Sequence, residues 1–296
     1  MKPAILLLFC ISAHQSFTQS TNGLEITDLS QMEIRLLNQY KNVDSIVKSK
    51  VYLDSLYCPY LTFWQGYAGD ENAFMSWMHR EGKVFLDYLN KRNSSINGPR
   101  LLRQLEEVKD RLSILTDHQA IGKWYIVYFH GATDLGGLGN GNMLIDLSHE
   151  SNSSNDNIMR MFPHEITHQI MNNTNTHQDS TALNSIVGEG FAVFMNQLYW
   201  GDKYTLAQNL GYSEAELKAC KRHRYFIKNF FEKNKYTTDN ATIEMFRSRN
   251  FKLLPSLPGA IGYFIGFEIC QKYAKRSSWK EVFKKSPREI YQLSGY

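Results

Sequence analysis

Cysteine and proline are scarce in this chain, and long hydrophobic runs are missing altogether. The 296 residues include only four cysteines and seven prolines. Removal of Cys10 with a leader peptide leaves Cys58, Cys220 and Cys270, an odd number without a Cys-x-x-Cys pair, which argues against a disulfide framework and a thiolate metal site. At most one disulfide can form, and three free thiols are equally compatible with the sequence. Because no run of about 18 apolar residues occurs, the sequence predicts no transmembrane segment.

A strong excess of charge of either sign is also lacking. Lysine and arginine total 33 and aspartate and glutamate 29, giving a formal net charge of +4 that falls by one if Lys2 is removed with a leader. So weak a balance, without a concentrated basic face, predicts no nucleic-acid partner. Hydrophobic residues make up 43% and aromatic residues 13% of the chain, a globular composition with enough apolar side chains for a sizeable core.

The first 19 residues have the features of a secretion signal peptide. Lys2 supplies the positive charge, Ala4–Ala13 is apolar, and a polar segment follows. The apolar part is too short for a stable span, so we expect cleavage between Ala13 and Gln19. Cys10 does not follow the small residue that precedes a lipidated cysteine. The sequence therefore predicts an exported, secreted protein, periplasmic or extracellular.

The remaining chain has the order helices, small sheet, helices. Helical periodicity covers residues 29–56, 71–90 and 101–115, and it returns over 155–199, 213–231 and 259–274. Between these groups, Lys123–Phe129 and Asn142–Leu147 are rich in β-branched and aromatic or apolar residues, as strands are. We therefore predict an α+β fold that is mostly helical, with an N-terminal helical portion over residues 20–120 packed as one unit on a catalytic portion over 121–296.

The segment between the two predicted strands is rich in glycine. It reads GATDLGGLGNG over residues 131–141 and lacks the Lys-Ser/Thr pair of a phosphate-binding P-loop. We interpret it as a wide hairpin turn.

Residues 164–168 read HEITH, an HExxH motif that predicts a metal site. On a helix His164 and His168 lie one turn apart on the same face, where both imidazoles can bind one ion. Two neutral imidazoles plus a carboxylate suit Zn²⁺ and leave the fourth tetrahedral position to water. Glu165 lies about 100° around the helix from His164, where it can accept a proton from that water without being a ligand.

Glu189 is our preferred third ligand. It lies in the helical segment Leu183–Met195, on an otherwise apolar stripe where an isolated carboxylate is costly unless it meets a cation. His177, in the polar segment after the motif, is the runner-up. Gly188 and Gly190 flank Glu189, and close approach of another helix would explain both glycines.

This combination resembles the gluzincin class of zinc peptidases. HEITH followed 21 residues later by Glu189 in VGEGFA is similar to the HExxH and EGxA helices of a bacterial family of predicted zinc-dependent proteases. The resemblance extends from about Trp124 to the C-terminus and implies a zincin-like fold. One departure is Val193, which stands where better-known gluzincins carry an aspartate that orients a zinc histidine. The resemblance then leaves that role to Asp179 or a backbone carbonyl.

The resemblance also implies a hydrogen-bond donor for the transition state. Gluzincins place a tyrosine or histidine near the oxyanion, and Tyr263 lies in the segment GAIGYFIG that resembles the family's final helix. The alternative is that Tyr263 is an ordinary core aromatic, and His130 at the end of the first predicted strand is a rival donor.

Together these patterns predict an exported zinc metallopeptidase, a hydrolase acting on peptide or protein substrates. Zinc would polarise the carbonyl, Glu165 would transfer the proton, and the strand Asn142–Leu147 would be an edge for an extended peptide. The alternative is a catalytically silent secreted binding or assembly protein that retains a zincin fold.

Overall fold

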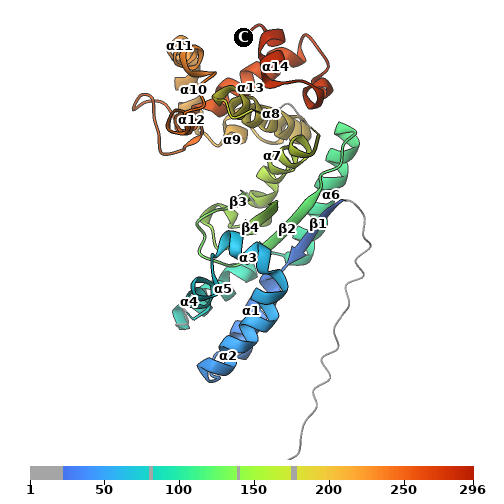
Figure 1. Cartoon of the computed structure of the whole chain (residues 1–296), viewed down its shortest axis with the longest axis vertical. Helices are drawn as coiled ribbons and strands as arrows, with labels where there is room; N and C mark the ends of the chain where they lie inside the picture. The colour runs from blue at the N-terminus through green and yellow to red at the C-terminus, as the bar shows by residue number, and fades with distance from the viewer. Residues whose placement is uncertain (1–22, 80–82, 139–140, 175–178) are drawn as a thin grey trace, which may run out of the picture.

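The chain folds into an α+β structure that is mostly helical, which confirms the predicted fold class. The computed structural model describes residues 23–79, 83–138, 141–174 and 179–296. The predicted signal peptide over residues 1–19 and the runner-up ligand His177 lie outside the described residues. Figure 1 shows the first helices of the chain at one end, the sheet and α6 in the middle and the C-terminal helices at the other end.

The N-terminal helices are shorter and more numerous than periodicity predicted. The predicted helix over 29–56 is interrupted after Gln39 and resumes where Asp44 caps the next helix by accepting a hydrogen bond from the Ile46 amide. Asn97 caps the last of the group in the same way, with Pro99 in its first turn. The α-helices that the structure describes in this portion are α1 (Ser30–Gln39), α2 (Ser45–Tyr52), α3 (Leu61–Tyr67), α4 (Glu71–Met78), α5 (Lys83–Ser95) and α6 (Gly98–Thr116).

A small mixed sheet has the strand order β1-β2-β4-β3. Its strands are β1 (Leu24–Asp28), β2 (Gly122–Val127), β3 (Leu135–Gly137) and β4 (Asn142–Asp146). The first three in this order are parallel, with Ile26 opposite Trp124 and Trp124 opposite Met143. Strand β3 is antiparallel to β4. Strand β1, which we did not predict, joins the N-terminal portion to the sheet through backbone hydrogen bonds.

Two predictions about this sheet are wrong. Strands β2 and β4 are parallel and therefore cannot form a hairpin. The glycine-rich segment itself supplies β3. Gly136 in this strand has a φ of +150°, a backbone conformation that residues with side chains rarely adopt. Strand β4 is also not an edge, because β3 covers it. Among the described residues, the edge beside the HEITH helix is β3.

The crossover after β2 is held by a buried carboxylate. Asp146, at the end of β4, accepts hydrogen bonds from the amides of Phe129, Gly131 and Ser148 and from the Tyr67 hydroxyl, at 2.6–3.1 Å. Satisfied in this way, a buried carboxylate can fix the path of a loop without a cation.

Helix α7 (Asn155–Thr174) carries HEITH and packs against the sheet (Figure 1). Trp124 of β2 meets α7 through two contacts, an edge-to-face contact with Phe162 at 5.0 Å between ring centroids and a 2.6 Å hydrogen bond from its indole to the Gln169 amide oxygen. Because these two residues flank HEITH, they set the orientation of the motif.

Pro163 lies inside α7. The sequence left open whether the helix starts at this proline or continues through it, and the structure shows that it continues. Proline cannot donate to the preceding turn, and its own carbonyl accepts a hydrogen bond from the Thr167 hydroxyl at 2.8 Å.

Glu189 lies on α8, the first α-helix after α7. The α-helices of this C-terminal portion are α8 (Ala182–Trp200), α9 (Leu206–Leu210), α10 (Glu214–Arg222), α11 (Arg224–Asn234), α12 (Asn240–Arg247), α13 (Ile261–Ala274) and α14 (Pro287–Ser294). Helix α8 packs chiefly on α13 and α7. Within the described ranges, no helix combines the length and apolarity needed to cross a bilayer. Cys58, Cys220 and Cys270 are free, which settles the question of a disulfide among them.

Helices α8 and α13 touch backbone to backbone. A Cβ placed on Gly190 would lie 1.9 Å from the carbonyl carbon of Gly266. Close approach of a helix therefore explains Gly190, as predicted, but not Gly188, where an added Cβ would meet nothing within 4 Å. This contact fixes the position of α8, and hence of Glu189, against the start of α13.

Candidate metal centre

His164, His168 and Glu189 converge where α7 crosses α8. The Glu189 Oε2 atom lies 3.3 Å from His164 Nε2 and 3.2 Å from His168 Nε2, and the two Nε2 atoms are 3.1 Å apart. The carboxylate therefore faces both imidazoles, in the arrangement that the sequence predicted for the third ligand. Assignment of the three residues as ligands stays a prediction.

The spacing of these three atoms suits one small cation. Zinc bonds of roughly 2.0–2.1 Å in a tetrahedron place neighbouring ligand atoms roughly 3.3–3.4 Å apart. The triangle of 3.1–3.3 Å edges is close to one face of such a tetrahedron. Two nitrogen donors and one oxygen donor are also the chemistry that Zn²⁺ accepts, and the fourth position stays open.

The electrostatics of the cluster favour the forms that bind a cation, with one exception. His164 is 2% exposed, and burial lowers its pKa. Burial raises the pKa of Glu189, but the two imidazoles outweigh it and hold this pKa well below the ordinary value. Burial lowers the pKa of His168, yet the Glu189 carboxylate raises it more, to about 9. A metal must therefore displace a proton from His168.

Glu165 lies beside the triad without joining it. Its Oε1 atom is 4.0 Å from His164 Nε2, and a Cβ built on Gly136 of β3 would lie 3.7 Å from its Oε2. Burial raises the pKa of Glu165 to about 8, so the carboxyl group is largely protonated at neutral pH. It can hydrogen-bond to a group at the open metal position.

Tyr263 packs against His164 from the first turn of α13. The two rings are parallel, with 5.9 Å between centroids and 5° between planes. Burial raises the pKa of Tyr263, and the nearby Glu189 carboxylate raises it further. The Arg249 guanidinium lies over the Tyr263 ring, 4.8 Å from its centroid. The tyrosine is thus both a packing residue and a neighbour of the triad.

The Nδ1 atom of His164 has no hydrogen-bond partner among the residues that the structure describes, so no aspartate of that part of the chain orients this ring. Asp179, which the sequence analysis considered for this role, instead accepts from the amide and hydroxyl of Thr181, next to the N-terminus of α8. Val193 is fully buried. The His164 ring instead packs against the parallel ring of Tyr263.

His130 is not part of this cluster. It is exposed, its Nδ1 accepts from the Ala132 amide, and its ring packs beside Tyr67 and Phe129. Of the two rival donors considered from sequence, the structure brings only Tyr263 to the triad.

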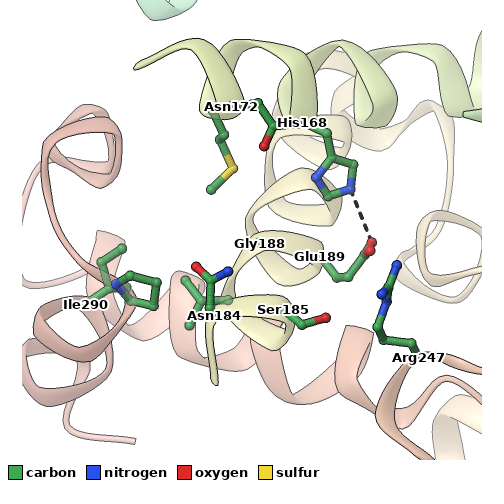
Figure 2. A pocket seen from close by; sticks show the side chains of 11 residues that line it. His168, Asn172, Asn184, Ser185, Gly188, Glu189, Arg247 and Ile290 are labelled. Atoms are coloured by element: carbon green, nitrogen blue, oxygen red, sulfur yellow. Dashed lines mark hydrogen bonds and ion pairs between the residues drawn. The ribbon is translucent and has the colours of Figure 1, made fainter. Parts of the chain in front are cut away.

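A pocket of about 230 Å³ opens beside the triad (Figure 2). His168 and Glu189 form part of its wall, and the side chain of Arg247, the last residue of α12, points toward Glu189. Sequence analysis missed Arg247 and Arg249. No local motif marks them, because they reach the site only through packing of α12 and α13 against α8.

The fold and the site thus define an α+β protein with a His₂Glu cluster between two packed helices. Residues 150–296, which include the whole cluster, match the family described as "Gliding motility protein GldB". No curated protein and no solved structure matches the chain. The family match is consistent with an exported or envelope-associated protein.

This match corrects the predicted identity and activity. The segment that resembled a zinc-dependent protease family matches a motility family instead, so the interpretation as a gluzincin, a metallopeptidase or any hydrolase is wrong, and peptide substrates are not supported. The roles of proton acceptor and oxyanion donor assigned to Glu165 and Tyr263 depended on that interpretation. The physical reason is that HExxH plus a downstream glutamate specifies how a cation can be held, and turnover requires more than a held cation.

Proposed function

We propose that this protein is an exported, catalytically silent binding or assembly component of the gliding motility apparatus, with one Zn²⁺ held by His164, His168 and Glu189. The family match over residues 150–296 carries this proposal, because it covers α7 and α8 together with the triad. The alternative considered from sequence, a binding protein that retains a metal site, fits this match better than a peptidase does.

The proposed metal has a structural role. Its ligands come from α7 and α8, which are joined by residues 175–181, so one ion would cross-link two helices at the centre of the C-terminal portion. Metal bound to the folded chain stabilises it by mass action. The pocket beside the triad, which is lined by α7, α8, α12 and α14, would then keep one shape for a protein partner on the periplasmic or extracellular side of the membrane.

Replacement of Glu165 by glutamine tests the absence of turnover. We expect Glu165→Gln to keep one equivalent of zinc and to support gliding as the unmodified protein does. The reason is that glutamine keeps the size and hydrogen-bonding capacity of the side chain and removes only its ability to accept a proton, which a site without turnover does not need. Gliding speed of cells whose only copy carries the variant is the measurement.

The matched control is His168→Ala in the same cells, which should lose zinc and impair gliding. A Glu165→Gln protein that retains zinc but fails to support gliding would show that Glu165 does chemistry and would contradict the proposal.

A further inference from the structure

We infer that the pocket beside the triad binds a carboxylate group of a protein partner, with Arg247 as the counter-charge. This inference rests on the proposed function and deepens it, since it names the chemistry by which a partner is held.

The pocket lies between four helices and has two kinds of wall. Figure 2 shows Asn184 and Ser185 between Arg247 and Ile290. The polar and small lining residues are Asn172, Asn184, Ser185 and Gly188, and the apolar ones are Met171, Val187, Pro287 and Ile290. About 230 Å³ accommodates a carboxylate-bearing side chain or chain end together with adjoining backbone. The apolar wall, of which α14 contributes two residues and α7 and α8 one each, suits the aliphatic part of a peptide.

Arg247 is only weakly engaged by the protein itself. Its ion pair is with Glu244, one turn earlier on α12, at 3.6 Å, and the side chains are 51% and 59% exposed. Exposed pairs at this spacing contribute little to stability, so the guanidinium can exchange this partner for another carboxylate. The planar guanidinium matches a carboxylate with two parallel hydrogen bonds.

The charge at the pocket favours an anion over a cation. The charges of its lining residues Glu189 and Arg247 cancel, and His168, which also lines it, is neutral when it binds the proposed ion. The proposed dication therefore leaves the pocket positive. The Arg247 side chain points toward Glu189, so an anionic group held by Arg247 would lie beside the triad.

Isothermal titration calorimetry on the zinc-loaded mature chain tests the inference with three seven-residue peptides that are otherwise alike. One has a free C-terminal carboxylate and no acidic side chain, one is amidated with a central glutamate, and one is amidated with glutamine in its place. We expect at least one of the two carboxylate peptides to bind roughly 10-fold or more tightly than the glutamine amide, because hydrogen bonds to a charged group are the stronger ones. Which of the two binds identifies the source of the carboxylate.

The variant Arg247→Gln should lose that preference and keep its zinc. Arg222→Gln on α10 is the matched control, since Arg222 is exposed and does not line the pocket. Equal thermal melting of both variants excludes misfolding as the cause.

Two results would overturn the inference: equal binding of all three peptides to zinc-loaded protein, or an unchanged carboxylate preference in Arg247→Gln. Neither result would contradict the proposed metal centre. Failure of the mature chain to bind zinc at all would instead count against the proposed function, so the two failures are distinguishable.

Discussion

Alanine at His164 or His168 should abolish stoichiometric zinc, while the unmodified mature chain should retain about one equivalent after dialysis. Each substitution removes one of three converging donors, and two protein ligands do not hold zinc against dilution. Glu189→Gln preserves shape and removes the charge, so zinc affinity should fall by more than the roughly 100-fold that loss of a supporting hydrogen bond costs. Elemental analysis gives the stoichiometry, and competition with a chromogenic chelator gives the affinity.

Two further histidines provide controls. His130→Ala should leave zinc binding unchanged, because His130 is exposed and lies beside Tyr67 and Phe129. His177→Ala should also leave it nearly unchanged. A full equivalent of tightly bound zinc in both His164→Ala and His168→Ala would place the site elsewhere. Loss of zinc in His177→Ala combined with retention in Glu189→Gln would assign the third ligand to His177.

Alanine at Gly266 should destabilise the fold severely. The added Cβ would lie 1.9 Å from the Ile186 carbonyl oxygen and 2.9 Å from the Gly190 Cα, both backbone atoms that cannot rotate away. Helices α8 and α13 must then separate, and we expect a loss of at least about 3 kcal/mol, at the upper end of what overpacking costs. Urea unfolding followed by circular dichroism measures it, and weaker zinc binding should accompany it because Glu189 is adjacent to this contact.

Gly188→Ala is the matched control on the same helix. An added Cβ there meets nothing within 4 Å, so the better helix propensity of alanine should leave stability equal or raise it by up to about 1 kcal/mol. Gly190→Ala should behave like Gly266→Ala. Comparable stability of Gly188→Ala and Gly266→Ala would show that α8 and α13 do not pack as closely as described.

The correction of function shows where motif reasoning stops. HEITH and Glu189 were recognised from spacing, and the structure brings their donor atoms within 4.8 Å of one another. The sequence alone shows that His164 and His168 are one helical turn apart. It also shows that Glu189 is a carboxylate among apolar residues of one helix face, where burial is costly. The activity was inferred by analogy with peptidases that share the motif. A donor set is compatible with many roles, and the family match points to motility.

Local rules accounted for much of the architecture. Helical periodicity located α6, α7, α8 and α13, and Ser286 and Glu289 form a capping box at the start of α14. These features depend on residues within one or two turns of each other, which is why one sequence is enough to find them.

Long-range packing decided the rest. The pairing of β1 with β2, the parallel arrangement of β2 and β4, and the position of β3 at the edge depend on segments up to about 100 residues apart, for which strand patterns carry no pairing information. The same holds for Tyr263, which reaches the triad where Gly190 and Gly266 let α8 and α13 meet backbone to backbone, and for Arg247, which reaches the pocket where α12 packs on α8 and α13. The spacing of neighbouring residues determines which donor atoms can hold a cation. The residues that surround that cation depend on how closely helices distant in sequence pack together.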